Sequence, residues 1–376
     1  MKALTENRML SANNKAYLFV FRYILSAFTV CTAAFILLKF PAISASGVKK
    51  GIDICLASLI PSLYPFMILT NYYAMSEISR IRIKTADKLC NFLFRLPGCC
   101  IAVILLSFVG GLPVGAKMSA ELYERGLISK EQFARLLSFC VNPGPAFVIS
   151  AVGVSMLRSK ETGIILYVSL IMSSLFIGIL SRYFAPADET YISCTANDNS
   201  SKNKRAPFEK AVIKSSKSLF SICAWVTAFS CFNEITANLN ISDALRSFIL
   251  CTSEMTNGSM TASECFSVPV VAAVIGFSGF CGHLQLIGEI KKAGMKYKYF
   301  LVSRIINSGL SAVICSFILK YFPVAEETFA VGIKPEAGEN SGSLFLSVMM
   351  LFMAALFLIG DDYRVGRKNT KKFNFY

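Results

Sequence analysis

Long apolar runs alternate with short polar segments along most of the 376-residue chain. Three of them, 17–40, 163–183 and 343–360, approach or exceed the roughly 20 residues that a helix needs to cross a bilayer. The first run has a long apolar core and further runs follow it, so it is interpreted as a retained span rather than a cleaved signal peptide. The pattern predicts an all-α polytopic membrane protein with about 7–9 spans.

The polar segments between these runs differ in charge, and the charge predicts their orientation. Segments 76–97, 184–213 and 361–376 are basic, so we expect them on the cytoplasmic side. Segment 322–341 is acidic and 237–263 has few basic residues, so both are expected outside.

The polar segment in the middle divides the chain into two parts that share landmarks in the same order. Glu121 and Gly126 recur as Glu289 and Gly294. We therefore expect two repeated halves whose leading spans run antiparallel, as in inverted-repeat transporters. The predicted parts are a leader span (1–45), a first membrane repeat (46–183), a polar cytoplasmic linker (184–212), a second membrane repeat (213–360) and a basic cytoplasmic tail (361–376).

Four pairs of segments are predicted to correspond between the halves. They are the leading spans (51–75 and 213–236), two broken segments (98–125 and 265–294), further spans (136–157 and 301–320) and closing spans (163–183 and 343–360). Strict inversion would leave the second broken segment on the outside, yet lysines follow it: Lys291, Lys292, Lys296 and Lys298. Either 265–294 crosses the membrane fully or these lysines line a vestibule.

Glycine and proline interrupt both broken segments. Neither "SFVGGLPVGAK" nor "GFSGFCGHLQ" can form one clean helix, and irregular backbone at membrane depth survives only inside protein or beside water. We expect hairpins or discontinuous helices, with a turn in the first near 110–113. The N–H groups of the following half-helix carry partial positive charge, which suits an anion. The predicted break residues are Gly110, Gly111, Pro113, Gly115, Gly276, Gly279 and Gly282.

Polar side chains gather near these breaks and are candidates for solute binding. A charge at mid-membrane costs about 2.5–3.5 kcal/mol, so Lys117 either faces a cavity or partner, or lies near the interface and snorkels. Asn142, in "NPGP", either offers hydrogen bonds or marks a kink, and Glu254 is either a loop residue or a cavity carboxylate. The candidates are Lys117, Asn142, Gly144, Glu254, Asn257, His283, Gln285 and Asn307.

His283 is the only histidine of the chain, and three roles are open for it. It can be a packed side chain satisfied by a backbone carbonyl, or a residue that handles substrate or protons. A metal ligand is the third role, although no second histidine and no set of carboxylates and cysteines accompany it. In a helix Gln285 would point elsewhere, whereas in an extended turn both side chains could face one cavity.

Composition supports the membrane assignment and narrows the function. Apolar residues form 54% of the chain, charged residues 16%, and the mean hydropathy is +0.56. The formal charge of +15 follows from basic loops and does not indicate nucleic-acid binding. The 13 cysteines lack metal spacing. No phosphate-binding loop and no nucleophile–base set occur, so we expect no enzyme, no cofactor and no metal.

Several motifs in fixed order carry a resemblance to a known family. "GGLPVGAK", "LYERGLIS", "SFCVNPGPAFVISAVG", "SEMTNG" and "GFSGFCGHLQ" together resemble the YlbJ-type (SpoVV) sporulation integral membrane proteins, which belong with the Gate-domain or nucleoside-recognition membrane proteins. The resemblance covers roughly residues 45–360. The chain departs from the family strings at Pro143, Ser278 and Gly282.

The resemblance implies a role in endospore formation, in the cell membrane or a membrane surrounding the forespore. It also implies passage of dipicolinate, a planar aromatic dianion, and we expect a transporter or facilitator for such a small organic anion. One alternative is a nucleoside or other solute carrier of the same architecture; another is a non-transporting scaffold of a sporulation membrane complex. The expected partners are membrane lipid, a small anionic solute and other sporulation membrane proteins, with no nucleic acid.

Overall fold

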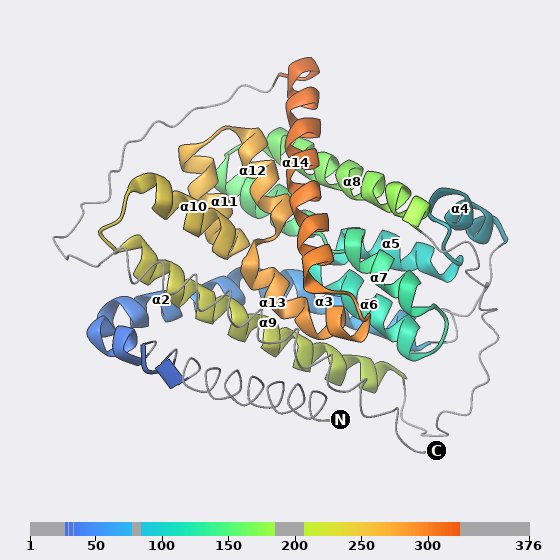
Figure 1. The fold of residues 1–376 in the computed structure, drawn as a ribbon, viewed down its shortest axis with the longest axis horizontal. Helices are drawn as coiled ribbons and strands as arrows, with labels where there is room; N and C mark the ends of the chain where they lie inside the picture. Colours follow the sequence, from blue (N-terminus) through green and yellow to red (C-terminus); the bar gives the residue numbers. More distant parts are fainter. Residues whose placement is uncertain (1–26, 29, 33, 77–83, 185–206, 324–376) are drawn as a thin grey trace, which may run out of the picture.

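The computed structural model describes residues 27–28, 30–32, 34–76, 84–184 and 207–323 (Figure 1). Every regular element in these ranges is helical. By length and composition four of the helices can cross a membrane, or up to six if each bent pair counts as one span. The predicted all-α membrane fold is confirmed. The predicted closing span 343–360, the tail 361–376, half of 17–40, and most of 184–213 and of 322–341 lie outside the described residues.

The leading spans of the two halves run antiparallel, as predicted. The first is continuous through α2 (Pro41–Ile54), a π-helical turn η1 (Cys55–Leu59) and α3 (Ile60–Met75), and the second is α9 (Pro207–Ala237). Lys50 pairs with Glu234 at 2.7 Å near one end, and the rings of Tyr72 and Phe208 lie 6.1 Å apart near the other. We call the side where α3 ends and α9 begins the loop side, and the opposite side the far side.

The first broken segment is a helical hairpin that enters and leaves on the loop side. The short helix α4 (Lys84–Phe94) leads into α5 (Cys99–Gly110), which packs along α6 (Leu112–Glu124). Gly111 joins them with φ 86°, a backbone angle that favours glycine, so the turn predicted near 110–113 is confirmed. Arg125 donates to the Ser76 carbonyl at 3.4 Å, which places the end of α6 on the loop side.

The predicted span 136–157 is interrupted at its two prolines. Helix α7 (Lys130–Phe139) is followed by irregular backbone and then by the π-helix η3 (Ala146–Met156). Pro143 and Pro145 have no N–H to donate, and a proline disfavours helical backbone at the residue before it, so the helix cannot continue through 140–144. Helix α8 (Lys160–Ser181) then returns to the loop side, close to the predicted 163–183.

The segment 237–263, expected as an outside loop, contains a second helical hairpin. Helix α10 (Asp243–Ser253) and helix α11 (Met255–Cys265) meet at Glu254 and pack against each other. The Ser253 hydroxyl donates to the Asn233 side chain on α9 at 2.5 Å, so the tip of the hairpin is held inside the protein.

The second broken segment crosses the molecule from the far side to the loop side. Helix α12 (Val268–Phe277) and helix α13 (Gly279–Lys292) together form a 25-residue candidate span. Lys292 pairs with Glu124 at the end of α6 at 2.7 Å, so α13 ends on the loop side. The lysines that follow 265–294 therefore lie where other basic loops begin, and no vestibule is needed to explain them.

This topology corrects the predicted pairing of the two broken segments. Segment 98–125 turns back whereas 265–294 crosses, so they are not counterparts. The hairpin α10–α11 corresponds to α5–α6, and the broken crossing α12–α13 corresponds to α7–η3. Helix α14 (Tyr297–Tyr321), which packs against α12 and α8 at the centre of Figure 1, confirms the predicted span 301–320. It corresponds to α8, so its predicted pairing with 136–157 is wrong. Each half thus has a leading span, a hairpin, a broken crossing and a complete crossing, in opposite orientations.

Candidate functional site

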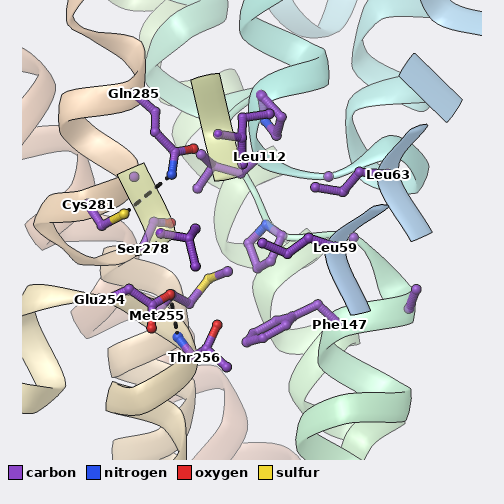
Figure 2. A pocket seen from close by; sticks show the side chains of 18 of the residues that line it. Leu59, Leu63, Leu112, Phe147, Glu254, Met255, Thr256, Ser278, Cys281 and Gln285 are labelled. Atoms are coloured by element: carbon purple, nitrogen blue, oxygen red, sulfur yellow. Dashed lines mark hydrogen bonds between the residues drawn. The ribbon is translucent and has the colours of Figure 1, made fainter. Parts of the chain in front are cut away.

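Four interruptions between described helices meet at one cavity of about 70 Å³. Two are the hairpin tips at Gly111 and Glu254, and two are the breaks of the crossings at 140–145 and 278–279. Figure 2 shows Glu254, Ser278 and Gln285 on one wall and Leu59, Leu112 and Phe147 facing them. Segments from both halves therefore share one interior site.

Close backbone contacts hold the first hairpin against the broken crossing of the same half. A side chain on Gly144 would come within 3.0 Å of the Val109 carbonyl oxygen and 3.3 Å of the Gly111 nitrogen. The predicted site residue Gly144 lines the cavity, and glycine is required there because backbone approaches backbone.

The corresponding contact in the second half joins Gly279 to the tip of α10–α11. Ser278 and Gly279 have φ of 69° and 60°, which marks the break itself. A side chain on Gly279 would lie 2.9 Å from the Met255 nitrogen and 3.0 Å from the Glu254 Cα. The departure from the family string at Ser278 thus coincides with the break, and serine adopts the left-handed conformation there.

Only some of the glycines predicted to break the chain do so. Gly111 and Gly279 form the turns, and Pro113 lies in the first turn of α6, where a missing N–H costs nothing. The others lie inside helices: Gly110, Gly115, Gly276 and Gly282. Their role is close packing, because a side chain on Gly115 would overlap the Cys140 carbonyl oxygen, and one on Gly276 would lie 2.6 Å from the Ser311 hydroxyl.

Glu254 is a cavity carboxylate rather than a loop residue. It is 3% exposed and lines the cavity. Its carboxylate accepts hydrogen bonds from the backbone N–H groups of Thr256 and Asn257, both at 2.9 Å, and so caps α11. The Asn257 amide adds a contact of 3.3 Å. Asn257 therefore acts on the cavity through Glu254 and does not line it.

The structure separates His283 from Gln285. Gln285 lines the cavity, and its amide contacts the Cys281 sulfur at 3.4 Å. His283, two residues earlier in the same helix, points elsewhere and is 1% exposed. Its Nε2 lies 2.9 Å from the Phe277 carbonyl oxygen and its Nδ1 lies 3.0 Å from the Tyr297 hydroxyl. Both ring nitrogens have partners in the protein, so His283 is packed structurally at the break, and the metal-ligand role has no support among the described residues.

Lys117 lies outside the cavity wall and has a partner on α13. Its ammonium pairs with the Glu289 carboxylate at 2.7 Å. Glu289 is also 3.3 Å from Lys292, which pairs with Glu124. Glu121 on the same face pairs with Lys214 of α9. These pairs, which we call the ion-pair cluster, tie α6, α13 and α9 together on the loop side.

Asn142 and Asn307 meet at a buried polar centre beside the cavity. The Ser174 hydroxyl lies 2.8 Å from the Asn142 side-chain oxygen and 3.3 Å from that of Asn307. Their amides donate to carbonyls next to the breaks, Asn142 to Phe139 at 2.7 Å and Asn307 to Gly276 at 3.1 Å. Both asparagines therefore stabilise the breaks from outside the cavity, and neither of them lines it.

Residues that were not predicted from the sequence also stabilise the breaks. Ser173 and Ser174 lie in the apolar run of α8, where isolated serines give no signal. Arg304 is fully buried and donates to the carbonyls of Ser138 and Val141. Its guanidinium thereby satisfies carbonyl groups at the end of α7 that the break frees.

The helix ends at the cavity give it a positive bias that one carboxylate partly offsets. Helices α6, η3 and α13 begin at Gly111, Pro145 and Ser278, none of which caps its helix with a side chain. Glu254 caps the fourth, α11. Uncapped N-terminal N–H groups attract anions, whereas Glu254 supplies an acceptor.

The fold and this cavity define an all-α integral membrane protein whose two inverted halves surround a central site. Comparison with curated proteins identifies the chain more closely. It is 26% identical to the sporulation integral membrane protein YlbJ of Bacillus subtilis (strain 168) over 337 residues, covering 79% of this chain and 82% of the relative. This similarity agrees with the resemblance that its motifs carry. No protein-family model matches it, and no solved structure matches it.

Proposed function

We propose that the protein is a transporter or facilitator that passes a small organic anion, dipicolinate, across a membrane during endospore formation. The observation that carries the proposal is the convergence of two hairpin tips and two broken crossings on one cavity. Discontinuous helices from inverted halves that meet midway are typical of secondary transporters. The relative's printed name supports the sporulation context.

Three uncapped helix N-termini support an anion as the solute. Each N-terminus carries about half a positive charge, and the cavity is otherwise mainly apolar. Apolar walls suit a flat aromatic ring, and the N–H groups suit its carboxylates.

The cavity volume indicates that dipicolinate does not fit in the described conformation. About 70 Å³ is less than the roughly 150 Å³ of an engineered cavity that admits benzene. A ring with two carboxylates enters only after the walls separate. The walls can separate between the hairpin tips and the broken crossings, because these segments contact one another without covalent links.

A second candidate is a carrier for a neutral solute such as a nucleoside, and Glu254 favours it. An ionised carboxylate about 4 Å from an anion repels it by about 4 kcal/mol per unit charge at an effective dielectric constant near 20. Lys117, a candidate for solute binding, lies in the ion-pair cluster. Glu254 and Gln285 can hydrogen-bond a neutral polar solute without this penalty.

Uptake into proteoliposomes tests the proposal. We expect the purified protein to admit dipicolinate faster than protein-free vesicles do, and Gln285→Ala to slow uptake at least several-fold. Gly288→Ala is the matched control, because Gly288 is in the same helix and a side chain there meets nothing within 4 Å. Uptake of uridine but not dipicolinate would favour the second candidate. Uptake of neither, with sporulation insensitive to cavity variants, would favour a scaffold.

A further inference from the structure

The cavity places a carboxylate without a positive partner where the proposed anion binds. Glu254 is 3% exposed, and among the described residues no lysine or arginine forms an ion pair with it. Other partly buried carboxylates behave differently: Glu289, Glu121 and Glu234 each pair with a lysine. A buried charge without a counter-ion is costly, and proteins retain it chiefly at functional sites.

Burial favours the neutral form of the Glu254 carboxyl group, and its hydrogen bonds favour the ionised form. Both carboxylate oxygens accept backbone N–H groups of α11, which stabilises the negative charge. The side chains facing it from neighbouring elements are neutral: the thiols of Cys281 on α13 and of Cys55 at η1, and the amide of Gln285. Within the described ranges, no positively charged side chain lines the cavity or pairs with Glu254 to shield it from an entering anion.

We propose that Glu254 is the coupling site, which takes up one proton when the anion binds and releases it when the anion leaves. This inference rests on the proposed function and identifies a proton gradient as the energy source for transport. A proton from water converts the carboxylate to a carboxylic acid, whose O–H then donates to a carboxylate oxygen of the solute. The charge repulsion that favours a neutral solute is thereby removed, so one site accommodates an anion together with a proton.

Linkage makes the effect reciprocal. If the anion strengthens proton binding at Glu254, protonation strengthens anion binding by the same factor. With one proton taken up per anion, the apparent dissociation constant for dipicolinate rises about tenfold for each pH unit, wherever free Glu254 is ionised and bound Glu254 is protonated. A neutral solute produces no such dependence.

The position of Glu254 suits this role mechanically. It lies at the tip of the hairpin α10–α11, and this tip contacts the break at Gly279. Any movement that opens the cavity between the second hairpin and α13 therefore exposes the carboxylate to water on that side. Proton exchange and solute exchange would occur in the same step.

The experiment measures dipicolinate uptake into proteoliposomes with an acid-outside pH gradient and the membrane potential held at zero by potassium and valinomycin. We expect the parent to accumulate dipicolinate above its outside concentration, by up to about tenfold per pH unit. Glu254→Gln should lose accumulation yet still exchange internal for external dipicolinate. Glu234→Gln, which removes a lysine-paired carboxylate away from the cavity, should behave like the parent.

Two further measurements test the coupling proposal if the Glu254→Gln variant fails to fold. The purified parent in weak buffer should take up about one proton per dipicolinate bound. Asn257→Ala removes a hydrogen bond to the ionised carboxylate, so the pH at which affinity falls should move upward. If uptake does not depend on the pH gradient, or if dipicolinate binds without proton uptake, the coupling site is refuted. The transporter proposal is not affected by either result. A parent that admits no dipicolinate under any gradient overturns both.

Discussion

At the scale of single residues, hydrogen-bond partners separate the side chains that stabilise the breaks from those that line the cavity. His283 and Asn142 looked like solute ligands in the sequence, but each satisfies a carbonyl freed by a broken helix. Gln285 and Glu254 keep atoms on the cavity wall. A polar residue beside a break can therefore either satisfy a freed carbonyl or line the cavity, and its hydrogen-bond partners distinguish these two roles.

The packing of His283 predicts a loss of stability without a change in pH dependence. His283→Gln cannot bridge Phe277 and Tyr297 in the same way, so a buried group loses its partner at a cost of about 1–3 kcal/mol. Thermal unfolding in detergent should show a lower midpoint, while uptake between about pH 5 and 8 should keep its profile. A flattened profile would instead make the imidazole the proton-handling group and contradict the structural role.

The ion pair of Lys117 with Glu289 predicts coupling between these two positions. Lys117→Met leaves a carboxylate that is 6% exposed with only its longer contact to Lys292, so we expect destabilisation by about 1–3 kcal/mol. In the double variant Lys117→Met/Glu289→Leu the uncompensated charge is gone, and part of the stability should return. A double-mutant cycle on unfolding free energies measures this. Additive losses, or uptake abolished in a stable Lys117→Met protein, would place Lys117 at the solute.

At the scale of elements, each interruption follows from local chemistry. Glycine at 111 and 279 allows positive φ, the two prolines around Gly144 remove helical hydrogen bonds, and Glu254 caps the helix that starts at the second hairpin tip. Tertiary partners then satisfy the freed backbone groups, which is what a membrane interior demands.

The contrast between two glycines of α13 tests the break. Alanine at Gly279 must adopt left-handed backbone, at about 1–2 kcal/mol, and would press on the tip of α10–α11. Gly279→Ala should therefore lower both the unfolding temperature and uptake. Gly288→Ala, in open space within the helix, should leave uptake unchanged and stabilise by roughly 0.5–1 kcal/mol. Equal behaviour of the two variants would contradict the assigned turn.

At the scale of the whole molecule, the two halves place their hairpins on opposite sides. Hairpin α5–α6 opens to the loop side and α10–α11 to the far side, so each half can close the cavity toward one surface. This arrangement permits alternating access with modest movements of the hairpins against the crossings.

The basic loops predict that the loop side is cytoplasmic. Cysteines introduced at Thr85 and Lys296, both exposed, should be labelled from the cytoplasmic face in a cysteine-depleted background, and a cysteine at position 330 from the opposite face. Labelling of position 85 and position 330 from the same face would refute the topology.

The sequence by itself determined the membrane class, the antiparallel leading spans and the first hairpin turn. These features depend on local chemistry: apolar runs of bilayer length, the distribution of lysine and arginine, and glycine or proline at a turn. The motifs also predicted the similarity to the sporulation integral membrane protein YlbJ, to which the chain is 26% identical.

Only the tertiary structure decided which broken segment reverses and which crosses, and which polar residues face the cavity. A glycine-rich break looks alike in a hairpin and in an interrupted span, and the difference comes from where the following helix finds its partner. For α13 that partner is α6, through Lys117, Glu289, Lys292 and Glu124. Glu254 became a cavity residue for the same reason, since the contacts that draw its hairpin inward come from helices distant in the chain.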